Sequence, residues 1–438
     1  MKTPICDFVR DYVNNEAMRL HMPGHKGKDF LGMEALDITE IDGADSLYEA
    51  SGIIRESEEN ASRLFGCPTF YSTEGSSQCI RAMLYLAVLH AKEQGKRPLI
   101  AAGRNAHKTF LTGAALLDLE VLWLYPKEVG SYLSCDLTAQ DVEVVLEAEK
   151  PTAVYLTSPD YLGNVADIAA IANVCHRHGA LLLVDNAHGA YLRFLRPSRH
   201  PMDLGADICC DSAHKTLPVL TGGAYLHCTE AFQDWAKNAL ALFGSTSPSY
   251  LILQSLDRVN PYLASLTDRL KEFVHHVEAV KEKLAEKGYV LYGQEPLKIT
   301  ISAKSYGYTG QTLAKILLER NIVSEFADPD FLVLMLTPEN RKSELDALET
   351  ALLSIPGQAP ILEQPPRFQP GQRVCSPREA MLRPMQTIPV GESEGRVLAA
   401  ATVGCPPAVP IVVSGERIDA HAIACFRYYG ITHCSVLK

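Results

Sequence analysis

The sequence predicts an α/β fold built around a largely parallel sheet. Between about Ser51 and Ser247, short apolar stretches alternate with longer amphipathic segments. This alternation is typical of strands that run in one direction with helices on both faces of the sheet. The chain of 438 residues, 47% hydrophobic and 21% charged, is long enough for a sizeable core and for two or three domains.

The individual elements follow from the spacing of the apolar residues. Ile80, Met83, Leu84 and Val88 recur at the spacing of one helix face, which predicts a helix over 78–90. The pattern further predicts strands at 153–157, 181–185 and 207–210 and a helix at 166–178 that ends at Gly179.

Changes in pattern divide the chain into five parts. A long helical pattern, interrupted near Pro261, leads out of the alternating region, and strand candidates at 297–301 and 331–336 indicate a smaller α/β unit. A proline-rich stretch after Pro356 begins a separate region. The predicted parts are an N-terminal segment bordering the active site (1–60), a large domain (61–250), linking helices (251–289), a small α/β domain (290–355) and a C-terminal domain (356–438).

Composition excludes several functional classes. The net charge of −11 and the lack of any block of Lys or Arg argue against a nucleic-acid surface. The acidic excess could steer cationic substrates or serve solubility alone. Twelve scattered cysteines without a CxxC pair indicate free thiols in a reducing cytoplasm. Because the sequence shows no signal segment and no apolar run long enough for a membrane span, we expect a soluble cytoplasmic protein.

Lys215 and Asp185 are the most informative pair of residues. Asp185 ends the apolar stretch 181–184, and Lys215 follows thirty residues later in the run 211–216. Pyridoxal phosphate (PLP), an aldehyde cofactor, needs an amine for a Schiff base and a carboxylate against its ring nitrogen. Ligands of doubly wound sheets bind at the carboxyl ends of the strands. The pair predicts a PLP site there, with Ala187 small enough to lie flat against the ring.

A phosphate needs donors, and the start of the helix at 78–90 offers them. Gly75, Ser76 and Ser77 present backbone N–H groups, two hydroxyls and the positive end of the helix dipole. The alternative is an ordinary serine N-cap, but the nearby Asp185 and Lys215 favour the phosphate. His107, after the apolar stretch 98–102, could stack on the ring or be an ordinary polar group.

Several runs of sequence match one known family. The most specific are HMPGHK at 21–26 and SAHKTLP at 212–218. Other matching runs lie at 37–66, 72–83, 104–110, 158–168, 184–194 and 245–257, with a weaker match at 376–418. On these residues the chain resembles the PLP-dependent Orn/Lys/Arg decarboxylases, in a short form without the N-terminal receiver-like domain. The resemblance implies an aspartate aminotransferase-type fold, with PLP in the large domain and smaller α/β C-terminal domains.

The resemblance also implies roles for single residues. Lys215 would form the Schiff base, His107 would stack on the ring, and Asp185 would pair with the ring nitrogen. The expected cofactor contacts also include Gly75, Ser76, Ser77, Ala187, His188, Ser212 and His214. Thr246 matches the position that reaches the phosphate of a neighbouring subunit, so we expect a homodimer or higher homo-oligomer with shared active sites.

The expected reaction is decarboxylation of arginine, lysine or ornithine to the corresponding amine, in polyamine or amine biosynthesis. Lys215 or His214 would return a proton to Cα. The distal cationic group of the substrate needs an anionic partner, for which Glu325 and Asp328 are candidates, although both could lie in a solvated loop. His25 either borders the same cleft or stiffens a Pro-Gly turn.

Some positions depart from the family pattern. Glu74 stands where the family usually has Asn, Tyr48 stands where it has His, and the run 405–410 and the residues 414–416 also differ. We expect Glu74 to point away from the phosphate. Another fold-type I PLP reaction, as in an aminotransferase or a lyase, is disfavoured because only Arg320 could bind an α-carboxylate between 297 and 320. A non-catalytic relative would be expected to lose Lys215.

Overall fold

A computed structural model describes residues 1–126, 131–367, 369–400 and 408–438. It divides the chain into two compact units. Unit 1 consists of Met1–Arg97 and Ile168–Leu270, and unit 2 consists of Pro98–Asp167 and Lys271–Lys438. Of the run that departs from the family pattern, residues 405–407 lie outside the described residues.

The predicted α/β class is confirmed, since seven strands form a mostly parallel sheet in the order β1-β7-β6-β5-β4-β2-β3. Unit 1 contributes β1 (Thr69–Ser72), β5 (Leu181–Asp185), β6 (Ile208–Asp211) and β7 (Ala224–Cys228), and unit 2 contributes β2 (Leu99–Gly103), β3 (Glu120–Leu124) and β4 (Ala153–Thr157). Strands β5 and β6 are parallel, as are β2, β3 and β4, whereas β7 runs antiparallel to β6 and β1.

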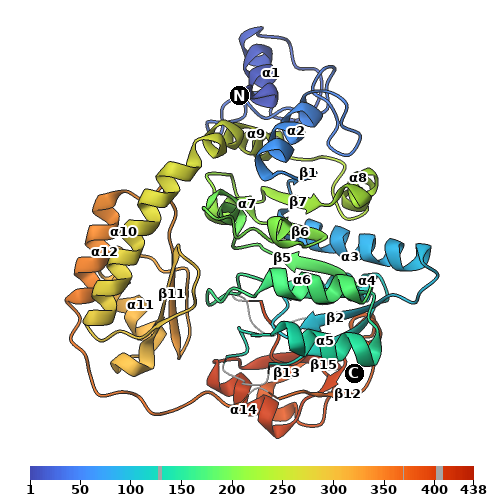
Figure 1. Ribbon diagram of the computed structural model, residues 1–438. Helices are drawn as coiled ribbons and strands as arrows, with labels where there is room; N and C mark the ends of the chain where they lie inside the picture. The colour runs from blue at the N-terminus through green and yellow to red at the C-terminus, as the bar shows by residue number, and fades with distance from the viewer. Residues whose placement is uncertain (127–130, 368, 401–407) are drawn as a thin grey trace. The chain divides into compact units, whose positions relative to one another are not determined.

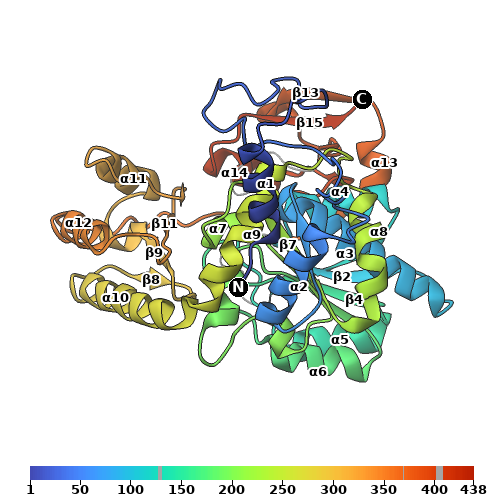
Figure 2. The same ribbon diagram turned by 90° about the horizontal axis from the view of Figure 1, so that it is seen from above.

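The helices of unit 1 include three that pack together at its N-terminal end (Figures 1 and 2). These are α1 (Pro4–Asn14), α2 (Ile53–Phe65) and α9 (Tyr250–Ala264). Asp257 of α9 joins them, since its carboxylate accepts from the backbone N–H of Cys6 at 3.0 Å and from the hydroxyl of Ser57 at 2.6 Å. The remaining helices of unit 1 are α3 (Gly75–Glu93), α6 (Ile168–Arg177), α7 (Ala213–Thr216) and α8 (Gln233–Ala241), with 3₁₀ turns at Ala190–Phe194, Pro201–Leu204 and Glu230–Phe232.

The predicted interruption near Pro261 was placed too early. Pro261 lies inside α9, and the chain leaves this helix at Ser265, before α10 (Leu266–Glu286) begins. A proline lacks only its own N–H and crowds the preceding turn, so a helix can continue for a few residues beyond it.

Unit 2 contains a second, antiparallel sheet with the order β10-β11-β9-β8. Its strands are β8 (Leu291–Tyr292), β9 (Lys298–Ser302), β10 (Phe326–Ala327) and β11 (Phe331–Met335). Helices α10, α11 (Gly310–Leu318) and α12 (Lys342–Leu353) cover one face of this sheet, as Figures 1 and 2 show. Two helices of unit 2 precede this sheet in the sequence, α4 (Lys108–Leu116) and α5 (Ala139–Glu149).

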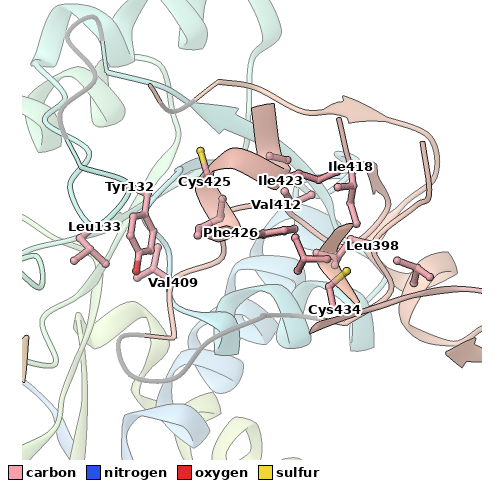
Figure 3. Packing of buried hydrophobic residues seen from close by; sticks show 14 of the residues in the cluster. Tyr132, Leu133, Leu398, Val409, Val412, Ile418, Ile423, Cys425, Phe426 and Cys434 are labelled. Atoms are coloured by element: carbon pink, nitrogen blue, oxygen red, sulfur yellow. The ribbon is translucent and has the colours of Figure 1, made fainter. Parts of the chain in front are cut away.

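The C-terminal part of unit 2 shares a hydrophobic core with earlier parts of the same unit, including Tyr132 and Leu133 (Figure 3). Strand β13 (Met385–Pro389) pairs with β15 (His433–Leu437), and β12 (Gln372–Arg373) pairs with β14 (Glu416–Arg417). Helix α14 (Ala420–Tyr428) brings Phe426 against Leu398, Ile418 and Val436, all fully buried, and α13 (Pro377–Met381) lies earlier in this part. Among the described residues, no helix is both long and apolar enough to cross a membrane.

Candidate active site

Two neighbouring strands of unit 1 end in buried carboxylates. Asp185 is the last residue of β5 and Asp211 is the last residue of β6. The strands are parallel, with Asp185 opposite Cys210, so both ends lie at the same edge of the sheet. Lys215 follows Asp211 in the short helix α7, which places the predicted Schiff-base lysine and the predicted ring-nitrogen partner at this edge.

Lys215 contacts the turn that follows Asp185. Its Nζ lies 2.9 Å from Nε2 of His188, and its backbone N–H donates to the carbonyl of Ser212 at 3.0 Å. The turn closes where the N–H of Gly189 donates to the carbonyl of Asn186 at 2.7 Å. Lys215 therefore contacts the turn that begins with Asp185, the other member of the predicted pair.

The carboxylate of Asp185 has a fixed orientation. Its Oδ1 accepts from the backbone N–H of Ala187 at 3.2 Å and from the thiol of Cys210 at 3.6 Å. Burial, together with the charge of Asp185, raises the pKa of Cys210, so this thiol keeps its proton and acts as a donor. Only 2% of Asp185 is exposed, as expected for a group that serves a buried ring.

The predicted phosphate ligands also come together. The hydroxyl of Ser212 donates to that of Ser76 at 2.8 Å, which joins the start of α7 to the start of α3. Gly75 has a φ of +70°, its N–H donates to the carbonyl of Gly222 at 2.7 Å, and no atom lies within 4 Å of where its Cβ would be. Two hydroxyls and the N-terminus of a long helix beside open space fit a phosphate dianion.

His214 is held by the neighbouring glycine pair. Its Nδ1 donates to the carbonyl of Gly223 at 2.9 Å, and its backbone N–H donates to the same oxygen at 3.2 Å. Burial lowers the pKa of His214, and the charge of Lys215 adds to this effect, although the bond to Gly223 opposes it. At neutral pH the ring is therefore neutral, and its Nε2 is an acceptor until a second proton binds.

Two departures from the family pattern have structural explanations. Glu74 is exposed and accepts from the backbone N–H of Ser245, the residue before Thr246. The hydroxyl of Tyr48 accepts from the side chain of Gln78 at 2.7 Å, and it would clash with any Cβ at residue 244, where the chain has glycine. The bond from Ser245 to Glu74 attaches the loop at 244–246 to the start of α3, and Tyr48 packs closely against this loop at Gly244.

The other predicted site residues lie in different surroundings. In unit 2, His107 caps α4, because its Nδ1 accepts from the N–H of Thr109 at 3.2 Å. In unit 1, Nδ1 of His25 accepts from the N–H of Gly27 at 3.0 Å, and its Nε2 contacts Asp37 at 3.2 Å. These contacts give each histidine a local structural role, and stacking of His107 on the ring stays a prediction.

The two candidate partners of a substrate cation differ in exposure. Glu325 is exposed and accepts from the hydroxyl of Tyr161 at 3.2 Å. Asp328 is 5% exposed and accepts from the N–H groups of Asp330 and Phe331 at 2.8 and 2.6 Å. The alternative of a solvated loop is therefore wrong for Asp328, which closes a buried turn.

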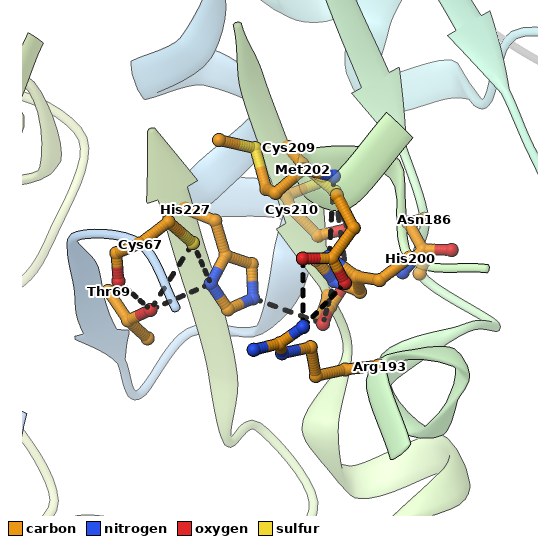
Figure 4. A network of polar contacts seen from close by, with 12 residues as sticks. Cys67, Thr69, Asn186, Arg193, His200, Met202, Cys209, Cys210 and His227 are labelled. Atoms are coloured by element: carbon orange, nitrogen blue, oxygen red, sulfur yellow. Dashed lines mark hydrogen bonds and ion pairs between the residues drawn. The ribbon is translucent and has the colours of Figure 1, made fainter. Parts of the chain in front are cut away.

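Sequence reasoning missed a buried network around Asp211 (Figure 4). Oδ2 of Asp211 accepts from Nε2 of His200 at 3.1 Å and from Nε2 of His227 at 3.0 Å. Its Oδ1 accepts from Nδ2 of Asn186 at 2.6 Å. Burial alone would raise the pKa of Asp211, but the two imidazoles reverse this and hold it far below its usual range. The available signal was the position of Asp211 at a strand end, directly before Ser212.

Part of this network has the composition of a metal site. His200, Cys209 and Asp211 lie close enough to share an ion. However, Nδ1 of His200 accepts from the N–H of Met202 at 3.4 Å, so its proton is on Nε2, toward Asp211. Burial and the charge of Asp211 raise the pKa of Cys209, which keeps the thiol protonated. In this structure hydrogen bonds join His200 and Cys209 to Asp211, so the cluster forms a hydrogen-bond network.

The strand-end carboxylate, the lysine of α7 and the hydroxyls at the start of α3 have the arrangement expected of a PLP-dependent enzyme of α/β fold. More narrowly, the chain belongs to the Orn/Lys/Arg decarboxylase family: the major-domain model of that family matches residues 3–300, and its C-terminal-domain model matches residues 369–434. The predicted family, cofactor and enzyme class are confirmed, and the protein is a PLP-dependent decarboxylase of a basic amino acid.

Individual relatives and solved structures are similar to this chain over most of its length. The chain is 29% identical over 455 residues to the uncharacterized protein YaaO of Bacillus subtilis, a match that covers 97% of this chain and 93% of that protein. It is 29% identical over 466 residues to an arginine decarboxylase of the same organism, covering 97% and 92%. Lysine decarboxylase LdcF of Francisella novicida has a similar fold, with a TM-score of 0.80 at 16% identity over 100% of this chain and 81% of that chain.

Proposed function

We propose that the residues at the carboxyl ends of β5 and β6 hold PLP for the decarboxylation of arginine, lysine or ornithine, in polyamine or amine biosynthesis. The observation that carries this proposal is the contact of 2.9 Å between Nζ of Lys215 and His188, in the turn that begins with Asp185. This contact supports a site in which the amine of Lys215 and the carboxylate of Asp185 reach the same cofactor. The paired hydroxyls of Ser76 and Ser212 support a phosphate beside them.

Each residue has a distinct task in the proposed mechanism. When bound, PLP takes up the electron pair that remains at Cα as CO₂ leaves. Asp185 would keep the proton on the ring nitrogen, and Ala187 would lie against the ring. Lys215 would hold the cofactor through its Nζ, and the same amine, when protonated, would return a proton to Cα. His188, next to Nζ, can accept or return that proton.

Arginine is the first substrate to test. Arginine decarboxylases of Bacillus subtilis and Halalkalibacterium halodurans are 29% and 28% identical to this chain over most of its length. Glu325 is the better candidate for binding the guanidinium, because its carboxylate is exposed beside the hydroxyl of Tyr161. Asp328 already serves two backbone N–H groups.

The direct experiment supplies arginine, lysine and ornithine separately to the purified protein with PLP and measures CO₂ together with the amine formed. Borohydride reduction followed by peptide mapping then identifies the modified lysine. We expect modification of Lys215 and release of one predominant amine. Modification of another lysine would contradict the site, and the absence of CO₂ with all three amino acids would contradict the substrate class.

We further propose a homodimer that buries the apolar segment at residues 18–36. Met18, Leu20, Phe30 and Leu31 are 82%, 85%, 76% and 82% exposed. Clustered apolar exposure of this kind marks an interaction surface. The segment is nevertheless ordered, since Arg19 donates to the carbonyl of Ala35 at 2.7 Å.

Light scattering tests the dimer. Replacing Phe30 and Leu31 with Asp should shift the mass toward that of one chain, whereas Val323→Asp, at a site that is 80% exposed in unit 2, should not. An unchanged mass in the Phe30 and Leu31 variant would place the interface elsewhere. In a shared site, Thr246 would reach the partner's phosphate.

A further inference from the structure

The carboxylate of Asp211 connects two segments that belong to the proposed cofactor site. Through Oδ1 it binds the side chain of Asn186, which lies between Asp185 and Ala187 in the turn after β5. In the sequence, Asp211 directly precedes Ser212, the residue before α7. The N–H of Asn186 also donates to the carbonyl of Cys210 at 3.0 Å, so the turn is attached to β6 at two points.

Three nitrogen donors hold this carboxylate in place, and the thiol of Cys209 adds a longer contact to Oδ1 at 3.8 Å. The imidazoles of His200 and His227 share Oδ2, while Asn186 binds Oδ1, and the three residues come from separate segments of unit 1. All four side chains are fully buried. A buried carboxylate with three donors stays ionised, and a hydrogen bond to a charged group is stronger than one between neutral groups.

The alternative of a purely structural network does not account for where Asn186 lies. Its turn contains three of the predicted cofactor contacts: Asp185 before it, and Ala187 and His188 after it. His188 in turn contacts Lys215. The turn has little freedom, because a Cβ at Gly189 would lie 2.0 Å from Oδ1 of Asn186. A shift of Asn186 would therefore move the groups on both sides of it.

We propose that Asp211 is a positioning residue for the cofactor site and that it acts through Asn186. Its carboxylate fixes the turn from Asp185 to His188, so that the ring-nitrogen partner, the surface under the ring and the neighbour of Lys215 keep one arrangement. This inference rests on the cofactor site proposed above at Asp185 and Lys215.

The test measures PLP binding by titration of the cofactor-free protein, its melting temperature, and kcat and KM with the preferred amino acid. The variants are Asp211→Asn, Asn186→Ala and the double variant, with Cys209→Ala as the matched control. The control removes the weak hydrogen bond that the thiol of Cys209 donates to Oδ1 of Asp211 at 3.8 Å, and it leaves the link between Asp211 and Asn186 in place. Asn186→Ala removes the link and keeps both histidine contacts, so it also serves if Asp211→Asn does not fold.

We expect the Kd for PLP to rise and kcat to fall by about ten- to a hundredfold in each single variant, the loss typical of a hydrogen bond to a charged group. KM should stay within about twofold, and the double variant should be no worse than the more affected single one, because coupled residues are not additive. Cys209→Ala should match the wild type.

Other results would overturn the proposal. A lower melting temperature with unchanged Kd and kcat would make the network purely structural. Full additivity in the double variant would show that Asp211 does not act through Asn186. If borohydride does not label Lys215 in the wild type, the proposed cofactor site itself is wrong, which is a separate and recognisable outcome.

Discussion

Replacing Asp328 with Asn is expected to stabilise the protein at neutral pH. Oδ1 of Asp328 serves two backbone N–H groups, whereas Oδ2 is buried and has no hydrogen-bond partner among the described residues. Burial raises the pKa of Asp328 to about 6, and the charge of Asp330 adds to this. Asn keeps the acceptor for both N–H groups and carries no charge.

The sign and size of the effect follow from the two pKa values. In the unfolded chain the pKa of Asp is about 3.9, so the folded state binds the proton more tightly. The stabilisation that comes from this tighter proton binding is complete below about pH 4 and is lost as the pH rises through about 6. The difference between the two pKa values corresponds to about 3 kcal/mol. Asp328→Asn should therefore match the wild type near pH 4 and be about 2–3 kcal/mol more stable at pH 8.

Calorimetry of the cofactor-free protein from pH 4 to pH 8 measures this gap. The control is Glu325→Gln, which removes an exposed carboxylate nearby and should produce no gap that grows with pH. A stability difference between Asp328→Asn and the wild type that stays constant from pH 4 to pH 8 would refute the reasoning. It would mean that ionisation of Asp328 does not destabilise the folded protein. The same variant tests substrate binding: an unchanged KM would assign Asp328 to the turn alone.

Four further predictions concern the site and the core. Lys215→Ala should abolish CO₂ release and borohydride labelling. Asp185→Asn should retain PLP, measured by absorbance, but lower kcat about a hundredfold, since a neutral amide stabilises the protonated ring poorly; near-normal turnover would make Asp185 structural. Phe426→Ala should cost about 3–5 kcal/mol in calorimetry, and an unchanged transition would contradict its place in the core. Mixed Lys215→Ala and Thr246→Ala chains should regain activity if subunits exchange, and no gain after verified exchange would exclude a shared site.

The fold could be predicted where burial leaves a periodic trace in the sequence. The strand predicted at 153–157 is β4, the strand at 181–185 is β5, and the helix at 166–178 is α6 to within two residues. The two strands are apolar on both faces, and the helix is apolar on the face that packs against the sheet. Strand β7 was missed because Tyr225 and His227 interrupt its apolar pattern. The hydrogen-bond partners of the buried His227 come from other segments of the chain.

The site was predictable where its residues are close in sequence to a strand end or a helix start. Asp185, Ser76 and Lys215 met this condition, although their roles toward PLP stay predictions. The five-part division of the chain also stays a prediction. His200 and His227 could not be recognised, because an isolated histidine in a sequence gives no sign of the carboxylate that it contacts in the fold.

The contacts of the two strand-end carboxylates also distinguish their roles. Asp211 accepts from three side-chain donors, which occupy both of its oxygens. A ring nitrogen would have to displace one of these buried donors and leave it without a partner, at a cost of about 1–3 kcal/mol. Asp185, on the neighbouring strand, lies beside the turn that reaches Lys215. These contacts favour the prediction that Asp185, of the two, serves the cofactor ring, and they support the proposal that Asp211 holds its turn in place.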